Sequence, residues 1–407
     1  MKDTFIVESY FDGENHQNKG PYVIKVNDGI VTEIGKAQPL DQTINPSVNN
    51  IYTHEFLMPG LVEAHCHLFL DGGELDFKKR SAYLKSDREN MLNVCRKNID
   101  KNLAHGISLI RDAGDIHGLN QQIKSELSEV KNYTPMLRSP GTAIRKTKRY
   151  GSFMAREVDN INDIEKLITE TSPNIDDLKV LITGIIDFDA GAVKGKPQFS
   201  EEELLAISKK ALECNIQTFA HCSGVDGIKL AIKTHMNSIE HGFFMETQYL
   251  EAMAEKNISW VPTYSPVHFQ WDRPELANWS KVAVTKLRQI LDNHLEQIKK
   301  ANKTGVSLIA GSDAGSYGVE HGKALIDELF FFEQAGLSTK DILISATTEP
   351  RRKWNCRDAS IKVNNKADFL VLENSPFKDL NNIKKVVGLY NGNWSEASIP
   401  QLKNLCS

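Results

Sequence analysis

The sequence has few cysteines, no long apolar run and little net charge, and each absence excludes a class of protein. Its 407 residues include six scattered cysteines without a C-x-x-C pair, which predicts reduced thiols and a cytoplasmic protein rather than a disulfide framework. The most apolar stretch, 180–188, is far shorter than the roughly 20 residues of a membrane span, and the N-terminus lacks a signal-peptide core. The net charge of −4 is too small to indicate a nucleic-acid or membrane partner.

Both ends of the chain have the pattern of short β-strands. Near the N-terminus, Asp28-Gly29 separates two β-rich runs, which is a strong hairpin signal. Near the C-terminus, residues 367–376 and 386–394 have the same character. We therefore predict that residues 1–56 and 353–407 are the two parts of one small, discontinuous β-sandwich domain.

The long middle region alternates short apolar runs with amphipathic helical stretches, such as the one that follows a Ser-x-x-Glu capping box at 200–203. Eight strands are predicted, at 57–67, 107–113, 136–140, 178–183, 216–221, 238–241, 258–263 and 306–313. Eight strand–helix units favour an α/β fold of the (β/α)8 TIM-barrel type over residues 57–352. The alternative is a doubly wound sheet, but its usual glycine-rich phosphate turn after the first strand is missing from the sequence.

Histidines and an aspartate lie at the ends of four predicted strands. His65 and His67 end the first strand, and both project to one face because side chains alternate along a strand. His221, His241 and Asp313 end the fifth, sixth and eighth strands, at the face where barrel enzymes place their chemistry. Imidazole and carboxylate groups are suitable ligands for zinc and other divalent first-row metals. The recurrence predicts a metal site.

Two charged residues inside apolar strands need separate interpretations. Lys179 lies within the fourth strand, and one interpretation is an edge lysine whose stem reaches solvent. Directed into the barrel, its amine would instead be kept neutral by desolvation and could capture carbon dioxide as a carbamate, a two-oxygen anionic ligand. Glu240 precedes His241 and points away from it by alternation, which predicts a structural or supporting role.

Several of these segments resemble the amidohydrolase superfamily of metal-dependent hydrolases, and the resemblance covers most of the chain. MPGLVEAHCHLF at 58–69 is similar to the family's P-G-[LF]-[IV]-[DE]-x-H-x-H strand. Other matching segments are SLIRDAGD at 108–115, SIEHG at 238–242, GSDAG at 311–315, the closing helix at 335–352 and the returning β segment at 365–380. Within the superfamily, the sequence most resembles the Xaa-Pro dipeptidase and carboxypeptidase group, which includes many imidazolonepropionase-like proteins.

The resemblance implies a site with two divalent metal ions. Its ligands would be His65, His67 and Asp313 for one ion, His221 and His241 for the other, and Lys179 as a carbamate that bridges both. Zinc is the default metal from ligand softness, with manganese, cobalt and iron as alternatives. The ions would activate a bridging hydroxide as the nucleophile and polarise the scissile carbonyl. Asp313 would be the general base in the attack and then the general acid for the leaving amine.

Two departures from the family's patterns bear on the reaction. Family deaminases, and imidazolonepropionase itself, carry an acid shortly after strand five, where this chain has Cys222-Ser223-Gly224. Many dipeptidase relatives have a Gly-His-Gly loop after strand three, where this chain has GTAIRKTKRYGSFMARE at 141–157.

We expect an enzyme that hydrolyses an amide or peptide bond of a small substrate, such as a dipeptide or N-acyl amino acid with a free carboxylate. The alternatives are hydrolysis of a cyclic amide, carbamate or urea, a deamination, or a barrel that binds without catalysis.

Candidate substrate contacts lie in the loops at the same face. Arg145 and Arg149 follow strand three and could bind a carboxylate through a guanidinium fork, although each also fits a solvated basic loop. Tyr264, after strand seven, could donate a hydrogen bond or pack against neighbouring prolines. Tyr150 and His321 are further candidates for lining the pocket. Relatives often self-associate, which leaves a homo-oligomer open without any residue that indicates one.

Overall fold

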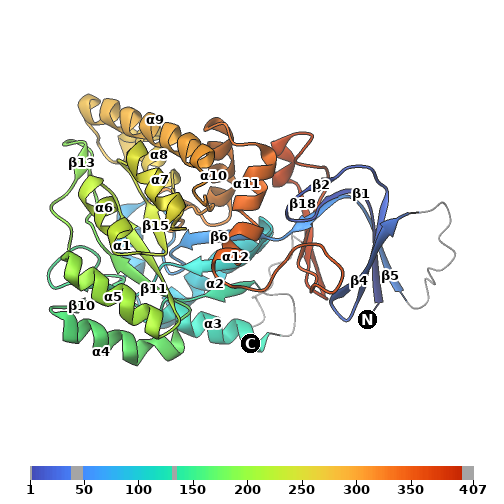
Figure 1. Cartoon of the computed structure of the whole chain (residues 1–407), viewed down its shortest axis with the longest axis horizontal. Coiled ribbons are helices and arrows are strands. Elements are labelled where there is room, and N and C mark those ends of the chain that lie inside the picture. Colours follow the sequence, from blue (N-terminus) through green and yellow to red (C-terminus); the bar gives the residue numbers. More distant parts are fainter. Residues whose placement is uncertain (1, 38–48, 131–134, 397–407) are drawn as a thin grey trace.

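Strands from both ends of the chain pair in one sheet. The computed structural model, which describes residues 2–37, 49–130 and 135–396, places these strands together on one side of the molecule (Figure 1). The strands are β1 (Lys2–Phe11), β2 (His16–Gln17), β3 (Tyr22–Asn27), β4 (Ile30–Lys36), β5 (Asn49–Pro59), β17 (Phe369–Leu372), β18 (Val386–Tyr390) and β19 (Trp394–Glu396). The sheet has eight strands in the order β19-β18-β17-β5-β1-β3-β4, with β2 paired to β1.

The N-terminal hairpin forms where the sequence predicts it. Asp28 and Gly29 connect β3 to β4, and both have positive φ values, of 49° and 74°. Such a two-residue turn matches the right-handed twist of the flanking strands. One face of the sheet is apolar because side chains alternate along each strand, and it buries a cluster that includes Phe5, Ile24 and Phe369.

The middle of the chain contributes short parallel strands to two further sheets. These strands are β6 (Leu61–Cys66), β7 (Ile107–Asp112), β8 (Met136–Arg138), β9 (Ala143–Lys146), β10 (Ala155–Val158), β11 (Asp177–Leu181), β14 (Gln217–Cys222), β15 (Ser238–His241) and β16 (Ser259–Val261). Their orders are β6-β7-β8 and β10-β9-β11-β14-β15-β16. A small hairpin, β12 (Ile186–Asp187) with β13 (Ala192–Val193), extends from the loop after β11.

Hydrogen bonds connect the two parallel sheets at two places. On one side, the Asp176 N–H donates to the Ser139 carbonyl over 2.9 Å, between β8 and β11. On the other, residues 306–313 lie between β16 and β6, where the Ile309 N–H donates to Trp260 and the Ala64 N–H to Ala310. This is an α/β fold consistent with a TIM barrel.

The predicted strand at 306–313 is wrong as a continuous strand. In this described segment the pairing is a single isolated bridge, from Leu308 to Trp260, and the next bridge to β6, from Ala314 to Cys66, lies just beyond it. The segment divides its hydrogen bonds between two neighbours, and Asp313 leaves the pleat with a φ of 55°. The apolar run therefore predicts correctly that the segment is buried. It does not predict the backbone, because Asp313 at the end of the segment leaves the strand conformation.

Helices cover the outside of the parallel strands (Figure 1). The α-helices are α1 (Phe77–Tyr83), α2 (Arg88–Ala104), α3 (Leu119–Glu129), α4 (Ile161–Thr171), α5 (Glu201–Glu213), α6 (Val225–Lys233), α7 (Thr247–Glu255), α8 (Ser265–Asp272), α9 (Lys281–Thr304), α10 (Lys323–Gln334), α11 (Thr339–Ser345) and α12 (Thr348–Lys353). Three 3-10 turns are η1 (Ser172–Asn174), η2 (Pro274–Leu276) and η3 (Leu380–Lys384). The predicted capping box opens α5, with both reciprocal bonds between Ser200 and Glu203 present. Among the described residues, none of the helices combines the length and the apolar character that a membrane span requires.

A buried ion pair fastens the eight-stranded sheet to the parallel strands. Arg351 of α12 is 2% exposed, and its Nη2 lies 2.7 Å from Asp368, next to β17. The same guanidinium donates to Ser108 in β7 and to the carbonyl of Gly60, between β5 and β6. Arg351 therefore connects the eight-stranded sheet to the parallel strands through several hydrogen bonds at once.

Candidate metal centre

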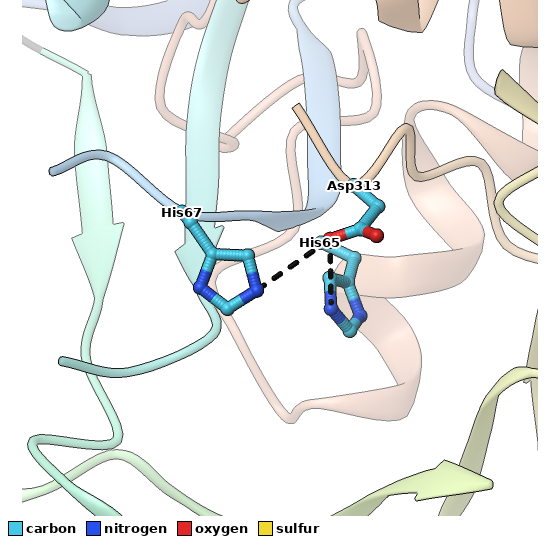
Figure 2. Close-up of side chains that lie close together, drawn as sticks. All are labelled: His65, His67 and Asp313. Carbon is cyan, nitrogen blue, oxygen red and sulfur yellow. Dashed lines mark ion pairs between the residues drawn. The ribbon is translucent and has the colours of Figure 1, made fainter. Parts of the chain in front are cut away.

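Two imidazoles and a carboxylate face a common point at the ends of the parallel strands. His65 lies in β6, His67 follows it, and Figure 2 shows both rings turned toward the carboxylate of Asp313. Asp313 Oδ1 is 3.7 Å from His65 Nε2 and 3.5 Å from His67 Nε2. These distances exceed a normal hydrogen bond, but they match the roughly 3.4 Å between ligands placed tetrahedrally around a zinc-sized ion. The three ligand atoms lie within 4.8 Å of one another.

The remaining predicted ligands complete a single buried cluster. His221 Nδ1 is 2.8 Å from His241 Nε2, and the ring centroids of His241 and His65 are 5.0 Å apart. Lys179 in β11 is 1% exposed, and its Nζ lies 3.2 Å from His65 Nε2. A stem that reaches solvent is thus excluded for Lys179, whose amine points into the cluster.

A buried acid orients His65. Glu240 Oε2 lies 2.6 Å from His65 Nδ1 and accepts its hydrogen, which leaves the Nε2 lone pair directed at the cluster. The same carboxylate is 3.1 Å from Arg111 Nη2 and accepts a hydrogen bond from the Ser238 hydroxyl. The supporting role predicted for Glu240 is therefore observed, with His65 rather than its neighbour His241 as the partner.

A second buried acid connects the two segments that carry the first three ligands. Glu63 Oε1 accepts hydrogen bonds of 2.9 Å from the backbone N–H groups of His65 and Ser312, and its Oε2 accepts from the Ser312 hydroxyl. This arrangement locks the end of β6 to the residue before Asp313. His241 is held in turn by Thr263, whose hydroxyl oxygen is 2.7 Å from the His241 Nδ1.

The backbone is in the left-handed region at three of these strand ends. His241, Thr263 and Asp313 have φ values of 68°, 41° and 55°. For residues with a Cβ, such conformations cost of the order of 1–3 kcal/mol each and concentrate at functional sites. Gly315 permits the turn after Asp313, because a Cβ there would lie 2.6 Å from the His67 carbonyl oxygen.

Burial keeps the imidazoles neutral. It lowers the pKa of His67 and of His221 to about 3, and it lowers the pKa values of His65 and His241 well below their ordinary range. Neutral imidazoles offer a lone pair to a metal at neutral pH. The donor set of nitrogen and carboxylate oxygen therefore fits divalent first-row metals.

The lysine and the aspartate of the cluster are shifted in opposite directions. Burial lowers the pKa of Lys179 to about 8, against the favourable charges of Glu240 and Asp313. Burial likewise raises the pKa of Asp313 to about 7, against the favourable charge of Lys179. The pKa values of Lys179 and Asp313 therefore both lie near neutral pH, as is common at reaction centres.

The predicted substrate contacts fall into two groups. Tyr150 lies at the cluster, with its ring centroid 5.4 Å from that of His221, and burial together with the charge of Asp313 raises its pKa. Arg149 is exposed nearby and donates to the carbonyl of Lys196. Arg145 instead braces the loop, because its guanidinium donates to the Arg149 carbonyl and to Glu157.

The other two predicted contacts are packed inside the protein. Tyr264 is 1% exposed, and its ring centroid lies 4.4 Å from that of Phe331. His321 is also 1% exposed and its Nε2 lies 3.1 Å from the carbonyl of Leu70, which follows the His67 turn. The packing alternative therefore describes Tyr264, and His321 supports the loop after β6.

Comparisons with known proteins found a matching family model and several similar chains. The family model described as "Amidohydrolase family" matches residues 56–394. Ochratoxinase of Aspergillus niger is 22% identical over 405 residues, covering 91% of this chain and 80% of that protein. An uncharacterized protein of Mycobacterium tuberculosis is 23% identical over 308 residues, covering 75% and 76%. The crystal structure of a Xaa-Pro dipeptidase with bound methionine is similar with a TM-score of 0.83 and 21% identity, covering 97% of this chain and all (100%) of that one.

Proposed function

The chain belongs to the amidohydrolase family and is an enzyme acting on C–N bonds, and from that premise we propose that it is a binuclear metal-dependent hydrolase of small amides. Its substrate would be a dipeptide or an N-acyl amino acid with a free carboxylate. A similar protein of known structure is named a Xaa-Pro dipeptidase, which supports a dipeptide substrate. We also propose that residues 57–352 form a closed (β/α)8 barrel, and that residues 1–56 and 353–407 form the discontinuous β-sandwich domain.

The observation that carries this proposal is the convergence of six ligand-type side chains in one buried cluster. His65, His67 and Asp313 would hold one ion, His221 and His241 the other, and Lys179 would bridge both as a carbamate. The Lys179 amine supports this role by position, since it lies beside His65 inside the cluster. When bound, two divalent ions, with zinc as the default, would polarise the scissile carbonyl and make water acidic enough to attack it at neutral pH.

Asp313 is suited to move the proton. Its Oδ2 accepts a hydrogen bond of 3.0 Å from the Ser316 hydroxyl, while its Oδ1 faces His65 and His67. One oxygen is therefore fixed and the carboxylate is held in a single orientation. Asp313 would take a proton from the attacking water and deliver it to the nitrogen of the leaving amine, which completes amide cleavage without a second acid.

Two residues of the loop after β9 would bind the substrate. The raised pKa of Tyr150 keeps its hydroxyl protonated beside the cluster, where it can donate a hydrogen bond to a substrate oxygen. Arg149 is exposed at the same loop, and its guanidinium is shaped for the substrate carboxylate. Arg145 would act on binding only through the loop conformation that it braces.

Metal analysis with a hydrolysis screen tests the proposed function. Protein supplemented with zinc should hold two ions per chain and should release amine from members of a panel of dipeptides and N-acyl amino acids. Lys179→Ala should lower the metal content to one ion or less per chain and abolish most activity, with the exposed Lys166→Ala as the matched control. Ammonia release without amine release would instead establish a deaminase, and substoichiometric metal in the supplemented wild type would refute the binuclear site.

A further inference from the structure

Two exposed apolar residues come from neighbouring loops beside the candidate metal centre. Phe153 is 38% exposed and Ile116 is 42% exposed. They lie in the loops that follow β9 and β7, and the N–H of Ile116 donates to the carbonyl of Phe153 over 3.2 Å. Large apolar groups that remain exposed in adjacent loops form a surface that a ligand can cover.

Phe153 is the outer member of an aromatic cluster, which we define as Phe69, Tyr150 and Phe153. The Phe153 ring centroid lies 6.1 Å from that of Tyr150 and 6.5 Å from that of Phe69. These separations are typical of interacting aromatic pairs. Phe69 is 2% exposed, so the cluster has a buried base and an open edge at Phe153.

The aromatic cluster touches both halves of the metal centre. The Phe153 ring centroid is 6.3 Å from that of His67, and the Tyr150 centroid is 5.4 Å from that of His221. A group resting on Phe153 would therefore lie next to His67, one of the proposed metal ligands. The three members of the cluster carry no formal charge at neutral pH, which favours an uncharged apolar group there.

The exposure of Phe153 is built into the loop. The N–H of Met154 donates to the Gly151 carbonyl over 3.1 Å, and the N–H of Ala143 donates to Met154 over 2.9 Å. Gly151 permits this turn because its φ is +103° and a Cβ would lie 2.0 Å from a methyl carbon of Leu181. Backbone hydrogen bonds of the neighbouring residues thus hold the turn that carries Phe153, so the ring is fixed at the surface before a ligand binds.

We propose that Phe153, with Tyr150 and Phe69, forms the specificity subsite of this hydrolase and binds an aromatic or large apolar group of the substrate. The inference rests on the proposed function, and it names the substrate class as amides that carry such a group on the acyl or the amine side. Covering the exposed Phe153 ring removes apolar surface from water on both partners, which gives the preference.

Matched substrate pairs test the subsite in zinc-loaded protein. The pairs are N-acetyl-L-phenylalanine against N-acetyl-L-alanine, and N-benzoyl-L-alanine against N-acetyl-L-alanine. In at least one pair the aromatic member should have a kcat/KM about tenfold higher or more. Phe153→Ala and Phe153→Gln should reduce that ratio about five- to tenfold, whereas Phe153→Leu should retain a preference for apolar groups. Leu212→Ala, which removes an exposed apolar side chain on the outside of α5, should change neither value.

Product binding separates this inference from the proposed function. Calorimetry on the zinc-loaded wild type should show L-phenylalanine binding at least tenfold more tightly than L-alanine, or benzoate more tightly than acetate, and Phe153→Ala should remove the difference. If no amide is hydrolysed but this preference is found, the proposed function fails and the subsite stands. Equal affinities in the wild type, or a preference that survives both Phe153→Ala and Phe153→Gln, would overturn the subsite.

Discussion

Replacement of Glu240 by glutamine should weaken the metal centre from outside its ligand shell. The Glu240 side chain is fully buried and receives hydrogen bonds from His65, Arg111 and Ser238. A glutamine has the same shape but only one accepting oxygen, and its amide group would present hydrogens to one of these donors. The change therefore removes the acceptor that orients His65 without removing any ligand.

The expected magnitude has two parts. Loss of a carboxylate that orients a ligating histidine typically lowers metal affinity about 10- to 100-fold, which corresponds to roughly 1.4–2.8 kcal/mol. In addition, Arg111 is 2% exposed, and its charge loses the partner at 3.1 Å. An uncompensated buried charge costs about 3–5 kcal/mol of folding stability, partly offset here by the rings of Phe219 and Trp354, which lie 4.3 Å and 4.5 Å from the guanidinium.

Metal competition and urea unfolding measure the two parts separately. Zinc affinity is measured against a chromogenic chelator, and stability is measured on chelator-treated protein, so that metal binding does not enter the unfolding free energy. Ser238→Ala is the matched control, since it removes one hydrogen bond to the same carboxylate and leaves the pair with His65 intact. It should cost no more than about 1.5 kcal/mol of stability and leave zinc affinity nearly unchanged. Wild-type zinc affinity in Glu240→Gln would refute the orienting role.

Three further changes test other parts of the structure. Asp313→Asn should retain substantial metal but lose turnover, and near-normal turnover would exclude the proton-transfer role. Arg351→Met should destabilise the fold by about 3–5 kcal/mol in urea unfolding because it leaves buried Asp368 without this cation, whereas the exposed Arg352→Met should cost under about 1 kcal/mol. Burial raises the pKa of Glu328 from 4.5 to about 8, so the folded state keeps a proton that the unfolded state loses as the pH rises. The free energy of unfolding should therefore fall by up to about 1.4 kcal/mol per pH unit between pH 4.5 and about pH 8. Glu328→Gln should make this pH dependence weaker, and an unchanged pH dependence would show that another group titrates.

Most of the proposed ligand set could be predicted from the sequence because it depends on strand periodicity. His65 and His67 share a face by alternation, and parallel strands bring their C-terminal ends to one side, so His221, His241 and Asp313 could be grouped before any coordinates. The family and the enzyme class were predicted from the resemblance of segments such as 58–69, 238–242 and 311–315 to the amidohydrolase superfamily, and the matching family model confirms both. Periodicity did not predict the backbone at Asp313, where the left-handed φ ends the strand pattern.

The residues that we propose to face the substrate were harder to predict from the sequence, because loop conformation depends on partners far away in sequence. Arg145 has the composition of a carboxylate binder, yet its guanidinium is used by the loop itself. Phe153 carried no signal in the sequence, since its exposure follows from a turn whose glycine packs against Leu181. Glu63 could not be assigned a role either, because its partner Ser312 is 249 residues away.

The candidate metal centre combines several features that cost folding free energy, namely buried polar groups and left-handed backbone. This combination indicates that the residues are kept for function rather than for stability. Three imidazoles and an amine are buried together beside the partly exposed His221 and Asp313, although such polar groups are stable in the interior only when paired. His241 and Asp313 add the cost of left-handed backbone. Conflicts of this kind persist when the surrounding contacts over-determine the conformation, as the Glu63 and Glu240 networks do here. The cluster is therefore held ready in the folded chain, and binding of cations would satisfy the charges and lone pairs that the fold has already brought together.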